Sequence, residues 1–88
     1  MLEMLKIDLG ISTNAYDGRL TQYLTVAENA IKDEGAPSLD NTAPSDMQLI
    51  VMYAAWLWRR RDSMAEMPRM LRYTLNNRIL KDKMGGDE

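Results

Sequence analysis

The stretch Met47–Trp58, which reads MQLIVMYAAWLW, limits what this chain can fold into more than any other. Gln48 is its only polar residue, and Arg59–Arg61 follow at once. A surface helix normally keeps one apolar and one polar face, whereas this helix would be apolar on all sides. Because 88 residues offer little protein to cover it, we expect that other helices wrap it completely or that another copy of the chain covers it.

Composition narrows the classes of protein that fit. With 45% hydrophobic residues the chain can form one small core, and we expect a single domain over residues 1–84 with a disordered tail over residues 85–88. The chain has no His and no Cys, which removes the commonest general base and the usual zinc ligands. No pair of carboxylates is placed for acid–base chemistry. We therefore expect no enzyme, no cofactor, no bound metal and no small-molecule substrate.

The apolar stretch is too short to cross a bilayer, which takes about 20 residues. We therefore expect no membrane contact and a soluble, cytoplasmic protein.

Apolar spacing predicts four helices and no strand. The fold class is all-α: a small bundle with a short N-terminal helix, two long helices and a C-terminal helix. Gly35–Pro44 forms a long loop between the second and third helices. Ser45 and Gln48 fit a capping box at the start of the third helix. The expected helices cover about residues 2–9, 15–34, 45–61 and 68–84.

The last helix shows the spacing of three and four residues that is typical of a helix. The residues that recur at this spacing are Met67, Met70, Leu71, Thr74, Leu75, Arg78 and Ile79.

Two tryptophans in the third helix point to a contact between subunits. Trp56 and Trp58 lie about 200° apart on a helix, so one can face the core while the other needs a partner. Aromatic residues, Met and Arg are enriched at such interfaces. The candidate subunit interface is Leu49, Met52, Tyr53, Trp56, Arg59, Arg60 and Arg61.

Charge is unevenly divided along the chain. Residues 1–44 carry seven acidic and three basic residues, a net charge of −4, and residues 45–88 carry six acidic and eight basic residues, a net charge of +2. Opposite charges on two halves of one small domain could pair between neighbouring copies and set their orientation. The alternative is a set of solvated charged faces.

A small helical DNA-binding or regulatory module is the alternative function. Arg59–Arg61 and the basic last helix favour it. The negative net charge of the chain argues against it, since DNA-binding domains usually carry a strongly basic surface. The third helix is also too apolar for a recognition helix. A generic helical interaction module in another complex stays open as well.

The layout resembles the small head–tail connector proteins of tailed bacteriophages, also called head-completion or DNA-packaging adaptor proteins. Leu5–Ile11 is similar to their short first helix and turn, and Tyr16–Leu24, followed by Ala27 and Ile31, is similar to their acidic helix start and spacing. Trp58–Asp62 then precedes a short loop, Met67-Pro68, and a final helix with Asn77-Arg78. The chain departs from the pattern in its more basic Arg59–Arg61 and in its lack of Phe.

This resemblance implies a structural subunit with no catalytic residues. Copies would form a ring that docks on the portal protein and extends the DNA channel to the tail. The partners implied are the chain itself, the portal, neck and tail proteins, and a non-specific contact with DNA in the channel. The location implied is the virion neck, reached through the host cytoplasm during assembly.

Overall fold

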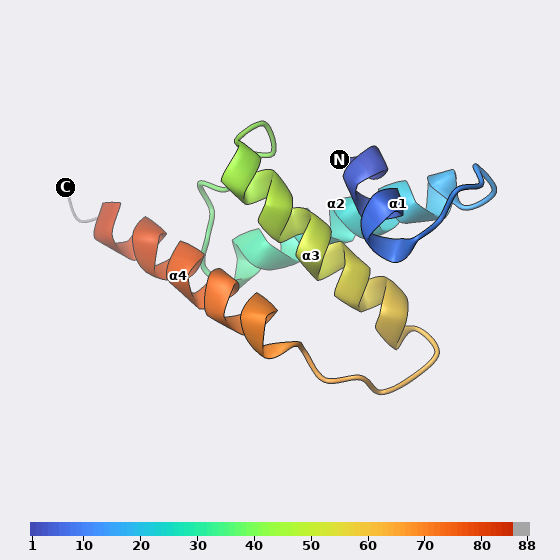
Figure 1. The fold of residues 1–88 in the computed structure, drawn as a ribbon. Coiled ribbons are helices and arrows are strands. Elements are labelled where there is room, and N and C mark those ends of the chain that lie inside the picture. The colour runs from blue at the N-terminus through green and yellow to red at the C-terminus, as the bar shows by residue number, and fades with distance from the viewer. Residues whose placement is uncertain (86–88) are drawn as a thin grey trace.

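The computed structural model describes residues 1–85 and contains four helices and no strand within that range. They are α1 (Leu2–Leu9), α2 (Asp17–Glu34), α3 (Pro44–Arg60) and α4 (Arg69–Gly85), arranged as Figure 1 shows. The predicted all-α bundle is confirmed. Helix α4 includes Gly85, which we expected in the tail, and the rest of that tail, residues 86–88, lies outside the described residues.

Helix α3 starts differently from the sequence prediction. Pro44 is its first residue, and Ala43 before it is extended and makes no side-chain cap. Proline suits the first turn because its missing N–H would have no partner there. The predicted capping box of Ser45 and Gln48 is therefore wrong, since the helix has already begun when it reaches Ser45.

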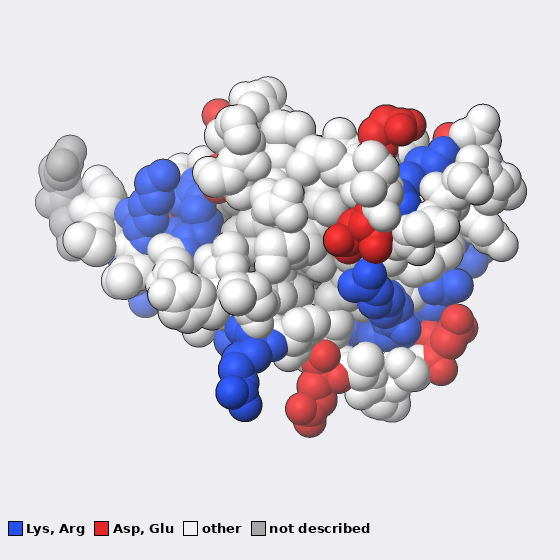
Figure 2. All heavy atoms as spheres, viewed as in Figure 1, with Lys and Arg blue, Asp and Glu red and all other residues white. Residues whose placement is uncertain are grey.

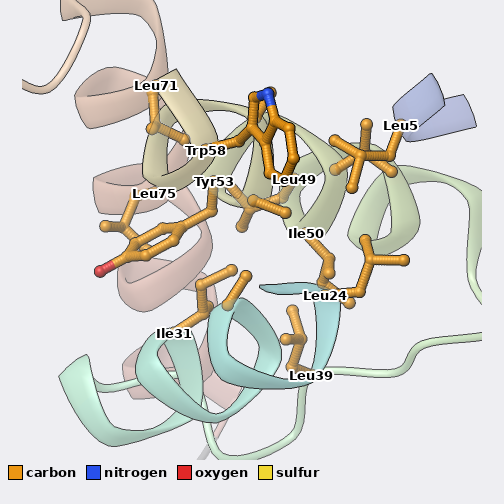
Figure 3. Close-up of a cluster of buried hydrophobic side chains, with 14 of the residues drawn as sticks. Leu5, Leu24, Ile31, Leu39, Leu49, Ile50, Tyr53, Trp58, Leu71 and Leu75 are labelled. Atoms are coloured by element: carbon orange, nitrogen blue, oxygen red, sulfur yellow. The ribbon is translucent and has the colours of Figure 1, made fainter. Parts of the chain in front are cut away.

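Helix α3 lies at the centre of the bundle and packs against each of the other three helices, most extensively against α2. Figure 3 shows side chains from all four helices converging on one apolar core, with Leu39 of the α2–α3 loop among them. The residues of α3 buried in this core are Leu49, Ile50, Val51, Tyr53, Ala54, Ala55 and Trp58.

A single protomer thus covers most of α3, so of the two alternatives for this helix the structure favours cover by its own chain over cover by a second copy. Two features explain this cover. Ala54 and Ala55 are small, and so is the buried Ala27 of α2, which allows helices to pack closely. The long α2–α3 loop also contributes Ala36 and Leu39 to the core, so connecting segments add cover that helix counting misses.

The end of α2 gives a prediction about stability. Gly35 has a φ of 139°, and a Cβ there would lie 2.9 Å from Cγ2 of Ile79 in α4. Gly35→Ala combines backbone strain with this clash, so we expect it to lower the free energy of unfolding by about 1–2 kcal/mol.

Gly18 supplies the matched control for Gly35. It lies in the first turn of α2, and a Cβ at Gly18 would meet nothing within 4 Å. Gly18→Ala is expected to raise the free energy of unfolding by about 0.4–1 kcal/mol. Urea titrations of both variants measure the two effects, and equal changes of the same sign would contradict the prediction.

Candidate interaction surface

The candidate interface residues on α3 divide into two groups. Leu49 and Tyr53 are only 1% and 7% exposed within one protomer, and burial is the main cause that raises the pKa of Tyr53. They belong to the core and cannot form an outer contact, which corrects their assignment. Met52 and Trp56 are half-buried, and Arg59–Arg61 are exposed.

The loop from α3 to α4 is what covers Trp56. The indole Nε1 donates a hydrogen bond to the carbonyl oxygen of Ala65 at 3.3 Å. Its ring also stands edge-on to Tyr53 at 5.5 Å between centroids, and the guanidinium of Arg60 lies 4.8 Å from its centroid. The two tryptophans do face different directions, but a loop rather than a second copy shields the outer one.

The three consecutive arginines are all engaged within their own protomer. Arg61 stacks on Trp58 at 3.8 Å and donates to its carbonyl oxygen at 2.6 Å, while Arg60 lies over Trp56. Arg59 donates to the backbone oxygen of Asp8 at 3.1 Å and pairs with its carboxylate at 3.6 Å. These contacts tie the end of α3 to its own chain.

The outer face of α4 carries a row of exposed apolar side chains, and the sequence prediction missed it. Met70, Tyr73, Leu80 and Met84 are 67%, 66%, 54% and 67% exposed. With the exposed Asn77 they form the α4 stripe. Leu71 and Leu75 are buried in the core, whereas Met70 is exposed and lies about 100° around the helix from Leu71.

Basic residues border the α4 stripe. Arg69, Arg72, Lys81 and Lys83 are all exposed, and Figure 2 shows Lys and Arg side chains gathered over α4. The one acidic residue of α4, Asp82, is withdrawn into ion pairing with Arg78. The exposed charge of α4 is therefore entirely positive.

A second apolar patch lies on α1 and carries the opposite charge. Ile7 is 79% exposed. A shallow hollow of about 260 Å³ beside it is lined by Met4, Ile7, Asp8, Gln48 and Val51, and we call this surface, with Glu3, the α1 patch. Lys6 is buried against Asp17 at 3.0 Å, so the exposed charges of α1 are the carboxylates of Glu3 and Asp8.

A nearly buried charge cluster joins α3, α4 and the α2–α3 loop. Nε of Arg78 donates to Asp46 Oδ1 at 2.7 Å, and the same guanidinium donates to Asp82 and, at 3.2 Å, to Ser38 Oγ. Ser38 donates to Asp82 through its hydroxyl and, at 2.9 Å, through its backbone N–H. The backbone N–H of Asp40 donates to Asp46 at 2.9 Å.

The cluster shifts the pKa values of its carboxylates. Hydrogen bonds from the hydroxyl and N–H of Ser38, followed by that from Arg78, lower the pKa of Asp82 to about 2. Burial pushes the pKa of Asp46 upward, but hydrogen bonds from Arg78 and Asp40 together with nearby positive charges outweigh it, and the pKa is lowered. Both groups stay ionised at neutral pH, so the cluster acts as an electrostatic clamp on the fold.

Neither a metal-binding cluster nor a membrane-spanning helix is found in the described part of the chain. Residues 1–85 contain no group of three or more potential metal-binding side chains. None of their helices combines the length and apolarity that a membrane span requires.

These features define a small helical protein whose charged and apolar outer faces are suited to contacts with other proteins. No curated protein and no solved structure matches the chain. The family model of the phage gp6-like head-tail connector proteins matches residues 1–81. The chain therefore belongs to the phage gp6-like head-tail connector family, which confirms the resemblance read from its sequence.

Proposed function

We propose that this protein is a structural subunit of a phage neck, that its copies form a ring, and that the ring docks on the portal and extends the DNA channel toward the tail. The family match over residues 1–81 carries the connector role. Exposed patches of opposite charge on α1 and α4 support a ring, because a closed ring needs two different faces on each subunit.

In this proposal the protein acts through binding and not through catalysis. In the charge cluster, Arg78 pairs with both Asp46 and Asp82, and Ser38 bonds to Arg78 and to Asp82. They stabilise the bundle and present no free nucleophile to a substrate. Partners are the portal on one side and neck or tail proteins on the other, and the site of action is the virion neck.

Co-purification with the portal tests the proposed function. The full chain is mixed with the portal protein encoded by the same phage genome, and the complex is analysed by gel filtration with light scattering and by electron microscopy. We expect a ring of this protein on one face of the portal. Absence of any complex at micromolar concentrations of both proteins would overturn the portal-docking proposal.

A DNA titration separates this role from the alternative of a DNA-binding module. The exposed basic residues of α4 are expected to give at most weak binding that is lost as salt rises. Tight binding of a short duplex with a preference for sequence would favour the alternative. The contacts of Arg59, Arg60 and Arg61 with their own chain argue against it.

A further inference from the structure

We propose that copies of this chain associate head to tail, with the α4 stripe of one protomer docked on the α1 patch of the next. This inference rests on the proposed function, since it names the two faces that the ring would use. It replaces the α3 interface that the sequence suggested, whose aliphatic and aromatic members are buried or half-buried within one protomer.

The α4 stripe has the residue spacing of a helix face that packs against another protein surface. Met70, Tyr73, Asn77, Leu80 and Met84 follow one another at steps of three and four. At 100° per residue they fall within roughly 80° of the helix circumference, as the core positions of a coiled coil do. A hollow of about 490 Å³ beside the stripe, lined by Arg69, Met70 and Tyr73, offers room for a partner side chain.

Charge decides against pairing of the stripe with a second α4. The neighbouring exposed side chains are Arg69, Arg72, Lys81 and Lys83, and all are positive. Two such helices packed seam to seam would bring like charges together on their flanks, which destabilises a pair and selects against it. The occupant of the stripe must be acidic at its edges.

The α1 patch of a second copy meets that requirement. It combines the projecting apolar side chain of Ile7, 79% exposed, with the exposed carboxylates of Glu3 and Asp8. Arg59 pairs with Asp8 from one side at 3.6 Å, but both side chains are about half exposed, so a partner can compete for the carboxylate. Docking would bury Ile7 against the stripe and place basic residues near these acids.

The positions of the two patches favour an assembly that grows from copy to copy. The protomer is elongated, with extents of 46 × 27 × 17 Å, and α1 and α4 lie toward opposite ends of it in Figure 1. A contact between different faces at opposite ends is heterologous, and such contacts generate rings when the rotation closes.

The test blocks one patch at a time with neutral substitutions that leave the charges unchanged. Ile7→Asn disables the α1 patch and Leu80→Asn disables the α4 stripe. Both side chains are more than half exposed, so the fold should persist, and far-UV circular dichroism checks it. Val26→Asn is the matched control, because Val26 is 54% exposed and lies on α2, outside both patches.

Sedimentation velocity at protein concentrations up to about 1 mM detects even weak self-association. We expect the wild type and Val26→Asn to associate, and each blocked variant alone to be weakened at least about tenfold. An equimolar mixture of the two blocked variants is expected to stop at a dimer, since one intact patch remains on each partner. Wild-type association should weaken as salt rises.

Three outcomes would overturn the inference. The first is a wild type that stays monomeric at about 1 mM. The second is association of Ile7→Asn equal to wild type with loss only in Leu80→Asn, which would mean that α4 pairs with itself. The third is association unaffected by either change. Recruitment to the portal is measured separately, so the connector role can stand or fail independently of this contact.

Discussion

Trp58→Ala is expected to lower the free energy of unfolding by about 3–5 kcal/mol, the largest loss for any single change considered for this chain. Trp58 is 7% exposed. Its ring meets those of Tyr16 and Tyr23 edge-on at 5.5 and 5.6 Å, and Arg61 covers it at 3.8 Å. Truncation would leave a cavity between α2 and α3 and would remove two aromatic contacts, each worth about 0.5–1.5 kcal/mol.

Trp56 provides the matched comparison on the same helix. It is half-buried and rests against a loop through one hydrogen bond to Ala65, so Trp56→Ala is expected to cost about half as much as Trp58→Ala. Urea unfolding followed by circular dichroism measures both losses. Trp58→Phe, which keeps an aromatic ring, gives a graded result if Trp58→Ala fails to fold. Equal losses for the two tryptophans would contradict this account of α3.

The sequence was sufficient to predict the four helices because several of their ends are marked by local chemistry. Glycines follow the first two helices, and prolines stand at or just before the start of the last two. The apolar spacing of α2, from Leu20 through Leu24 and Ala27 to Ile31, matches the residues that are buried. Periodicity of this kind survives tertiary packing, so the fold class and approximate bounds could be predicted.

The candidate surface could not be predicted in the same way, because it depends on what packs against each helix. Nothing local indicates that the loop covers Trp56, or that Leu71 is buried while Met70 stays exposed. The pairing of Asp46 with Arg78 spans 32 residues, and no spacing rule connects them. The sequence shows the steps of three and four from Met70 to Met84, but they indicate an exposed stripe only in combination with the burial of Leu71 and Leu75.

Arg78→Ala is expected to lower the free energy of unfolding by about 2–4 kcal/mol, which for a chain of this size corresponds to a fall in Tm of roughly 8–30 °C. The side chains of Arg78 and Asp46 are 11% and 8% exposed. Removing the guanidinium leaves carboxylates on α3 and α4 facing each other without their shared cation. A loss below about 0.5 kcal/mol, typical of a surface ion pair, would contradict the clamp.

Two variants separate the charge of Arg78 from its geometry. Arg72→Ala removes an exposed arginine from the same helix and is expected to change stability by no more than about 0.5 kcal/mol. Arg78→Lys keeps the positive charge but loses the planar guanidinium, whose several N–H groups donate to Asp46, Asp82 and Ser38 at the same time. We expect Arg78→Lys to recover only part of the loss. Full recovery would mean that charge alone, without the planar guanidinium, holds the cluster.

The pH dependence of the free energy of unfolding tests whether the ionised carboxylates of this cluster stabilise the fold. The folded pKa is about 2 for Asp82 and is lowered for Asp46, whereas an unfolded Asp titrates near 3.9. Because the folded pKa values are depressed, the stabilisation is fully present above about pH 5 and is lost as the pH falls from about 4 toward 2.

In Arg78→Ala the loss of stability with falling pH should be shallower, since the carboxylates lose their cation. The pKa of Asp40 is lowered by hydrogen bonds from the hydroxyl and N–H of Thr42. Asp40 therefore contributes to the pH dependence of stability in both proteins. Parallel acid titrations of wild type and variant would therefore contradict the conclusion that Arg78 helps to lower the pKa of Asp46 and, after Ser38, that of Asp82.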